Sequence, residues 1–263
     1  MRKPKKTVEA GFPGFWQQVY EQNTLFFDTT KELESLQNAI LRKPISGDLQ
    51  KAVGYLASSV SNSFGALITL VLNGYGNDAV VIARRMFESE LTAAYLKRHP
   101  EKVEDYLDFY YVHQKRLYDE TSKSTPELVH GIPRERVAEL EQKFKEVAPR
   151  FRKNNQLRTR WTEASVRQMA EGAGLVDLYH GFYSVSSSML HADIIGLTSQ
   201  TDQLGYLDFA PSKLWLKEAL VSGHGSVLRV LYCYNSVAQL GMETDIEAAL
   251  CRFREVWQQR IAQ

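Results

Sequence analysis

Apolar residues recur at helical spacing along almost the whole chain of 263 residues. Before Pro44 they stand three, four or seven positions apart, at Phe15, Val19, Phe26, Leu33, Leu36 and Ile40. Such spacing places side chains on one face of a helix, so it predicts an amphipathic helix that Pro44 ends. No segment shows the strict alternation of apolar and polar residues that marks a half-buried strand. The pattern therefore predicts an all-α protein.

Turn and cap signals divide the rest of the chain into further helices, about eight or nine in all. Gly74 is expected to cap one helix, Pro100 to separate two others, and Thr244 with Glu247 to form a capping box for the last. The predicted helices cover residues 48–73, 78–99, 100–122, 133–147, 162–174, 176–197 and 212–241, and a last one follows Thr244. We expect a single bundle domain of long antiparallel helices over residues 11–263, with extra packed helices and a basic, flexible end at residues 1–10.

Composition and charge narrow the class of protein. Hydrophobic residues make up 44% and charged residues 24% of the chain, which is usual for a globular protein. The formal net charge of +1 excludes a general nucleic-acid coat protein, since no global field attracts a polyanion. The two cysteines form no CxxC pair, so we expect neither a disulfide framework nor a zinc ribbon.

Two segments bear on the location of the protein. The basic start "MRKPKKTVEAGFPGFW" lacks the apolar region of a secretory signal. Residues 52–77 carry no charge, but only "ALITLVL" is continuously apolar, which is too short to span a bilayer. We therefore expect a cytoplasmic protein with no membrane contact, whose uncharged helix lies at the centre of the bundle.

The stretch "FYSVSSSMLH", residues 182–191, gathers polar side chains on a helix. Tyr183, Ser187 and His191 follow at i, i+4 and i+8, so they form one column that faces a core or a cleft. A metal site is disfavoured, because His180 and His191 stand about 16 Å apart on the helix and no HExxH motif occurs. A serine nucleophile lacks the GxSxG elbow. The alternative is a column of satisfied interior polar groups.

A second cluster lies on the helix predicted at residues 78–99. Glu88 has Arg84 four residues before it and Arg85 three residues before it. One interpretation is a surface ion pair of small energetic value. The other places Arg84 or Arg85 with Glu88 inside the bundle, facing the column of Tyr183 and His191, where an arginine could hold a phosphate or carboxylate.

A basic segment follows the helix predicted at 133–147. Five cations fall within eleven residues that contain no acid: Arg150, Arg152, Lys153, Arg158 and Arg160. They could contact the phosphate backbone of RNA. The alternative is a solvated connector between helices.

Three stretches in order, "NGYGNDAVVIARRMFESELTAAYL", "RWTEASVRQMAEGAG" and "LYHGFYSVSSSMLHAD", resemble a bacterial family of uncharacterised all-helical proteins. The residues that carry this resemblance are Asn73, Gly74, Arg85, Glu88, Trp161, Ser165, Tyr179, Tyr183, Ser187 and His191. The resemblance implies a fold and no activity. The chain is more loosely similar to HEPN-like domains (higher-eukaryote-and-prokaryote nucleotide-binding), many of which are metal-independent ribonucleases of toxin and phage-defence systems.

The HEPN signature is an arginine and a histidine with four to six residues between them, and this chain lacks it. A composite site could restore the chemistry, with Arg85 binding a phosphate, His191 as general acid or base, and Tyr183, Ser187 and Glu88 beside them. Our first hypothesis is therefore a metal-independent ribonuclease or defence effector that needs no cofactor and has RNA as its partner. The alternatives are a non-catalytic module that binds a partner protein or forms a homo-oligomer, and a ligand sensor that uses the same cleft.

Overall fold

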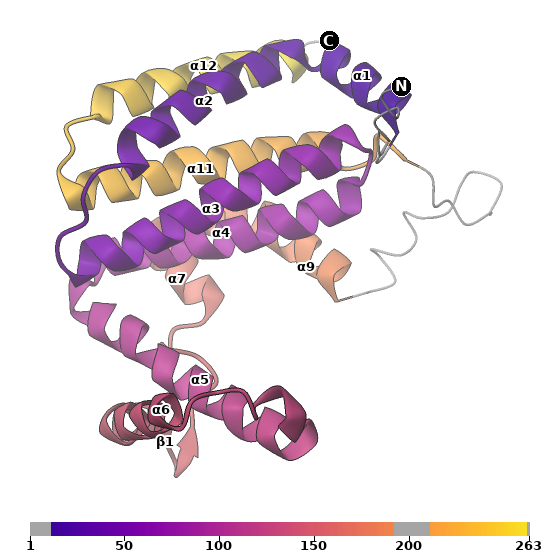
Figure 1. The fold of residues 1–263 in the computed structure, drawn as a ribbon. Coiled ribbons are helices and arrows are strands. Elements are labelled where there is room, and N and C mark those ends of the chain that lie inside the picture. Colours follow the sequence, from indigo (N-terminus) through magenta and orange to yellow (C-terminus); the bar gives the residue numbers. More distant parts are fainter. Residues whose placement is uncertain (1–11, 192–210, 262–263) are drawn as a thin grey trace, which may run out of the picture.

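The computed structural model describes residues 12–191 and 211–261 of the chain (Figure 1). Helices make up 81% of the structure and strands almost none, which confirms the all-α prediction. With the continuous stretch at residues 176–190 counted as one helix, the described residues contain ten helices, against eight or nine predicted. The basic end at residues 1–10 and the predicted helix end at 192–197 lie outside the described residues.

Three long helices form the centre of the bundle. They are α3 (Asp48–Leu72), α4 (Gly76–Arg98) and α11 (Leu216–Ala238), and each packs against the other two. A second layer made of α2 (Thr24–Leu41) and α12 (Glu243–Ile261) covers α11 on the side away from α4 (Figure 1). This arrangement places α4 at the edge of the central layer, where one of its faces is left for the shorter helices.

Close packing of the central helices depends on small residues. A Cβ atom on Gly223 of α11 would lie 2.7 Å from a methyl carbon of Leu67 on α3. The turn from α3 to α4 also needs a glycine, because Gly74 has φ +78°, a left-handed conformation that L-residues rarely adopt. The predicted cap at Gly74 is therefore confirmed, and the bounds of α3 and α4 agree with the predicted helices to within two residues.

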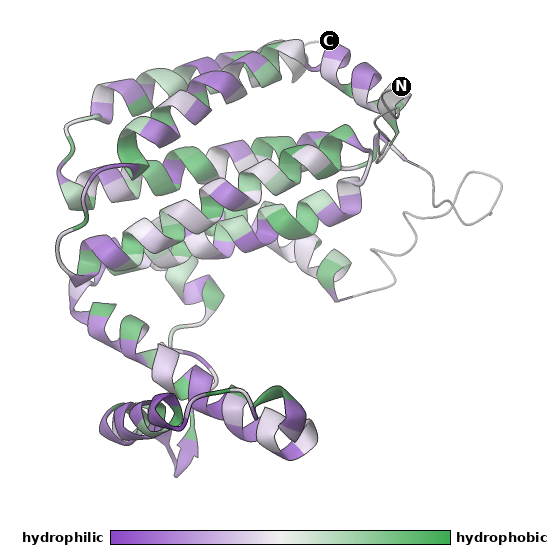
Figure 2. Cartoon of the chain, in the orientation of Figure 1, coloured by the Kyte–Doolittle hydropathy of each residue, from purple (hydrophilic) through white to green (hydrophobic). Residues whose placement is uncertain are grey.

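The chain next forms a lobe that extends away from the bundle (Figure 1). Its elements are η1 (Pro100–Lys102), α5 (Val103–Ser124), η2 (Pro126–Leu128), α6 (Arg134–Val147) and η3 (Ala148–Phe151). The lobe has its own small core of Val112, Val147 and Phe151, separate from the core of the bundle. Most of α6 is hydrophilic (Figure 2), as expected for a helix that buries one narrow stripe.

A two-residue hairpin occupies part of the basic segment. Strand β1 (Arg152–Lys153) pairs antiparallel with β2 (Gln156–Leu157). Asn154 and Asn155 make the turn with φ +51° and +61°, which asparagine tolerates better than most residues. The sequence shows no alternating run here, because strands of two residues are too short to produce one.

Two short helices return the chain to the exposed face of α4. Helix α7 (Val166–Ala173) begins at a capping box, in which the Ser165 hydroxyl accepts from the Gln168 N–H and the Gln168 side chain accepts from the Ser165 N–H. It therefore starts later than the predicted residue 162. The next helix is continuous but changes its winding, from α8 (Val176–Leu178) through a π turn, η4 (Tyr179–Tyr183), to α9 (Ser184–Leu190).

Two predicted helix boundaries were wrong. The first predicted helix is interrupted between α1 (Pro13–Gln22) and α2, because the Asn23 side chain donates to the Val19 carbonyl at 2.7 Å. The last helix begins at Glu243, so Thr244 lies inside it and does not cap it. The Asn235 side chain, at the end of α11, accepts from the Met242 N–H at 3.0 Å and does the capping from a distance.

Helix α3 is long and apolar enough to cross a membrane, judged by length and composition alone. One face of it packs against α4 and α11, with residues such as Val53, Leu67 and Val71 buried. The opposite face exposes Ser58 and Asn62. This burial pattern places α3 in the protein core with one polar side.

Candidate functional site

Three polar side chains form a closed triangle between α4 and η4. The Arg84 Nη2 donates to the Tyr183 hydroxyl at 2.9 Å, and that hydroxyl donates to Glu88 Oε1 at 2.9 Å. The Arg84 Nη2 also lies 3.1 Å from the same carboxylate oxygen. The structure thus joins segments more than ninety residues apart in sequence, and it brings together two of the predicted site residues, Glu88 and Tyr183.

The geometry of α4 decides which arginine takes part. Successive residues on an α-helix point about 100° apart, so Arg84 and Arg85 cannot face the same neighbour. Arg84 stands one turn from Glu88 and is buried against Tyr183. Arg85 is exposed and lines a groove with Ser59 of α3. Among the residues that the structure describes, no hydrogen bond or ion pair joins Arg85 to Glu88 or Tyr183. Arg84 occupies the position that the composite site had assigned to Arg85.

Burial gives the triangle its electrostatic character. The Arg84 side chain is 10% exposed, whereas that of Glu88 is 40% exposed. The Arg84 guanidinium also lies over the Tyr183 ring, 4.6 Å from its centroid. Burial, and then the hydrogen bond to Glu88, raise the pKa of the Tyr183 hydroxyl. Tyr183 therefore stays protonated at neutral pH and acts as the donor to Glu88.

A pocket of about 400 Å³ opens beside this triangle, and we call it the α4–η4 pocket. It is lined by Glu88, Leu91, Thr92, Arg160, Val166, Met169 and Tyr183. Its acid and tyrosine come from α4 and η4, its apolar wall from α4 and α7, and its cation from the basic segment. The sequence indicated Arg160 only as part of a charged run, and nothing in its spacing indicated that it lines the same pocket as Glu88.

Ser187 and His191 lie further along α9. The His191 imidazole is exposed at the end of this helix, about two turns beyond Tyr183. The His191 backbone N–H donates to the Ser187 carbonyl at 3.1 Å. Within residues 12–191 and 211–261, no hydrogen bond or ion pair links the His191 side chain to the triangle. The structure therefore does not bring the imidazole to the guanidinium.

Two other serines of this helix bond to its own backbone. The Ser184 hydroxyl donates to the Tyr179 carbonyl at 3.2 Å, and the buried Ser186 hydroxyl donates to the Tyr183 carbonyl at 3.1 Å. Such bonds satisfy a polar group locally and are structural. The Ser184 N–H also bonds back to Tyr179, five residues earlier, which defines the π turn. This turn sets the rotation at which Tyr183 faces α4.

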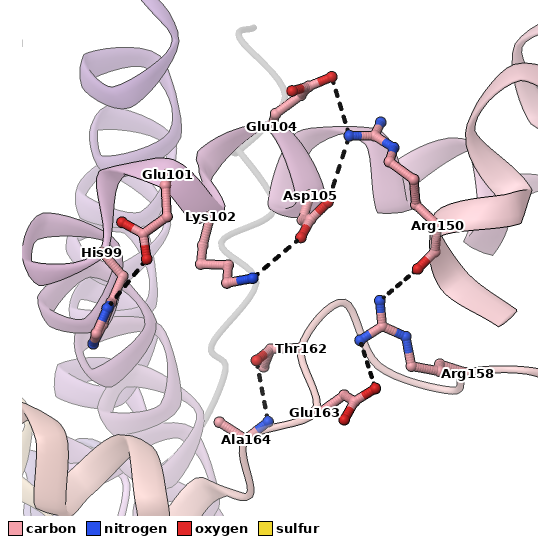
Figure 3. Close-up of polar contacts among 10 residues, drawn as sticks. All are labelled: His99, Glu101, Lys102, Glu104, Asp105, Arg150, Arg158, Thr162, Glu163 and Ala164. Atoms are coloured by element: carbon pink, nitrogen blue, oxygen red, sulfur yellow. Dashed lines mark hydrogen bonds and ion pairs between the residues drawn. The ribbon is translucent and has the colours of Figure 1, made fainter. Parts of the chain in front are cut away.

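The basic segment is largely neutralised by nearby acids. Arg150 lies 3.0 Å from Glu104 and also pairs with Asp105 and Asp108 of α5. Figure 3 shows the Arg158 guanidinium between Glu163 and the Arg150 carbonyl.

The remaining cations of the segment differ in their pairing. Lys153 pairs with Glu163 at 3.4 Å, and Arg152 donates to the Asn155 carbonyl. Arg160 is exposed and has no such partner among the described residues. Contact of this segment with RNA stays a prediction. Within the described residues, the charge of Arg160 is not neutralised by a carboxylate, so it is available to bind an anion.

Metal-binding groups do not gather at the pocket. In the part of the chain that the structure describes, no three His, Cys, Asp or Glu side chains lie close enough together to hold a metal ion. Both cysteines are free thiols, Cys233 buried and Cys251 exposed.

The fold and the site thus define an all-helical protein with a polar pocket beside the central layer of its bundle. Residues 50–204 match a family of unknown function, DUF5677, and this match covers more than half of the chain. The chain belongs to that family, which confirms the prediction of an uncharacterised family. All residues of the α4–η4 pocket lie inside the matched region. No curated protein and no solved structure matches the chain.

Proposed function

We propose that this protein is a ligand-binding module and that the α4–η4 pocket takes a small molecule with a phosphate or carboxylate group. The observation that carries this proposal is the exposed guanidinium of Arg160, which faces a pocket whose other polar groups are already fixed. The pocket sets these polar groups beside an apolar wall of Leu91, Val166 and Met169, and small-molecule sites likewise orient a ligand by a few placed polar groups.

The charges of the site favour an anion. Arg84 and Arg160 contribute two positive charges, and Glu88 contributes one negative charge that Arg84 balances at 3.1 Å. Arg160 is then left to bind an oxyanion through its forked donors. The second oxygen of Glu88 makes no hydrogen bond within the described residues, so it can accept from a hydroxyl or amine of the same ligand.

Ligand-induced stabilisation tests the proposal directly. Thermal melts with inorganic phosphate, adenosine monophosphate and citrate should show a rise in Tm for at least one of them. Isothermal titration of that compound should then show binding about tenfold weaker for Arg160→Gln, because the charge-assisted bonds are lost. The matched control is Arg152→Gln, which removes a cation of the same segment outside the pocket and should leave the affinity unchanged. Equal losses in both variants would contradict a specific site.

Metal-independent cleavage of RNA is a second candidate, favoured by the exposure of His191, which leaves its imidazole within reach of a polymer. It requires RNA to bridge from Arg160 to His191, since no hydrogen bond or ion pair among the described residues joins the His191 side chain to the triangle. Total RNA incubated with the protein in EDTA should then be cleaved, and His191→Ala should abolish cleavage while leaving the melting temperature unchanged. Cleavage that persists in His191→Ala would rule out this mechanism.

A further inference from the structure

We propose a second binding site, for a small amphipathic carboxylate, on the other side of α4. It is independent of the proposed function, because it shares no residue with the α4–η4 pocket. We call this hollow of about 360 Å³ the α4–α11 pocket. It is lined by Glu90, Ala94, Lys97, Arg98, Ala173, Leu175, Leu228, Arg229, Tyr232, Cys233, Ile246, Glu247 and Leu250.

The walls of this pocket are mostly apolar. Four helices contribute to it, because its lining residues come from α4, α11, the end of α7 and the start of α12. Aliphatic side chains such as Leu175, Leu228 and Leu250 supply most of the surface. The volume lies at the small end of the range for ligand pockets. A short alkyl chain or a single ring fits such a space, whereas a strongly hydrated ion alone gains nothing from it.

An ion pair forms one wall. Glu90 is fully buried, and Arg229 of α11 holds both of its carboxylate oxygens in a fork, with Nη2 at 3.0 Å from Oε2. The Glu90 side chain is 1% exposed and that of Arg229 is 32% exposed. The negative charge of Glu90 is therefore already neutralised. The part of this pair that a ligand can meet is the arginine.

Two further cations stand beside this pair. The Lys97 Nζ lies 4.7 Å from the centroid of the Tyr232 ring, and Arg98 is exposed at the end of α4. Within the described part of the chain, neither of them has a carboxylate partner. The other acid of the pocket is Glu247, which is exposed. A carboxylate head group would meet Lys97 and Arg98, whereas a cationic head group would be repelled by them.

The cysteine in this pocket belongs to the apolar wall. Cys233 is buried, and burial raises the pKa of its thiol to about 11. It is therefore neutral at physiological pH and adds no negative charge that would oppose an anionic ligand. The pocket thus combines an apolar interior with a positive rim, which matches a molecule that is apolar at one end and carries a carboxylate at the other.

Four probes of graded chemistry test this site by isothermal titration calorimetry. Octanoate should bind, because it has both the chain and the carboxylate. Octanol, which lacks the carboxylate, should bind at least about tenfold more weakly than octanoate. Acetate should not bind because it lacks the alkyl chain, and octylamine should not bind because its head group is positively charged. Octanol or octylamine binding as tightly as octanoate would overturn the proposal, as would the absence of octanoate binding.

Variants assign the binding to this pocket. Replacing both Lys97 and Arg98 by glutamine should weaken octanoate binding by about tenfold and leave octanol unchanged, because only the head-group contact is removed. These residues lie at the surface end of α4, so the double variant should keep its fold. Ala173→Phe should block octanoate and octanol alike by filling the hollow. The control is Arg160→Gln, which should leave octanoate binding unchanged, and an equal loss in that variant would overturn the assignment.

Discussion

Two glutamates of helix α4 pair with arginines, Glu88 with Arg84 of the same helix and Glu90 with Arg229 of α11, and the two pairs differ in which partner is buried. In the Arg84–Glu88 pair the arginine is buried, with 10% of its side chain exposed, whereas 40% of the glutamate side chain is exposed. In the Glu90–Arg229 pair the glutamate is buried, with 1% of its side chain exposed, whereas 32% of the arginine side chain is exposed. Glu88 and Glu90 are two residues apart on one helix, so they point to different sides. The comparison shows that the exposed partner of each pair decides which charge a ligand contacts. That charge is the negative carboxylate of Glu88 at one pocket and the positive guanidinium of Arg229 at the other.

The largest expected effect comes from breaking the sealed pair. Arg229→Met would leave the Glu90 carboxylate buried without a partner, and such a loss typically costs about 3–5 kcal/mol. Urea unfolding followed by circular dichroism should show this as a lower free energy of unfolding. The double variant Glu90→Gln with Arg229→Met should recover most of the loss, because no buried charge then remains. A single variant as stable as the wild type would contradict the burial described for Glu90.

The second prediction concerns a buried group that has no charge partner within residues 12–191 and 211–261. His224 of α11 lies in the apolar core, 4.3 Å from the Phe253 ring, and burial lowers the pKa of its imidazole to about 3. The neutral form is favoured in the folded state, so this stabilisation is complete above the unfolded pKa of 6.5 and is lost as the pH falls towards about 3. As the pH falls from 6.5 to about 4, the free energy of unfolding should decrease by roughly 3 kcal/mol.

Urea unfolding at a series of pH values tests this sign. The wild type should lose more stability below pH 6.5 than His224→Leu does, and the difference between the two should be flat above that value. Both proteins contain the same other titrating groups, so the difference isolates His224. Parallel curves for the two proteins would show that His224 does not titrate as a buried group.

The third and smallest effect separates the two neighbouring arginines. Arg84→Met removes a buried donor to Tyr183 and Glu88, and we expect a loss of about 2 kcal/mol. Arg85→Met removes an exposed cation and should change the free energy of unfolding by less than about 0.5 kcal/mol. The same unfolding measurement on both variants tests which of the two arginines of α4 faces Tyr183 and Glu88. Equal losses would mean that Arg85, as first expected, shares the buried position.

Periodicity and end signals were enough to predict most of the fold. Gly74 separates α3 from α4 and Pro100 separates α4 from α5 where expected, because a left-handed glycine and a proline act through local chemistry that the sequence displays. The break at Asn23 was missed, since an asparagine that bonds to Val19 looks like any polar residue on a helix surface. The capping of α12 was missed because Asn235 acts from a different helix.

The site was less predictable because it depends on how helices rotate against one another. Glu88 and Tyr183 could be proposed as neighbours from their polar character, but the sequence does not decide whether Arg84 or Arg85 joins them. Arg160 enters through the path of a connecting segment, which periodicity does not describe. Neither Glu90 nor Arg229 was indicated, although a lone acid on an apolar face of α4 is a signal that could have drawn attention.

The π turn at Tyr179–Tyr183 has a consequence for comparing members of this family. It accommodates one more residue than an ordinary helical turn, so a relative without that residue would need a gap in the middle of this helix when the chains are aligned. An alignment that forbids gaps within helices would then pair Ser187 and His191 with the wrong positions. Placing the gap between Tyr179 and Tyr183 keeps the residues on both sides in correspondence.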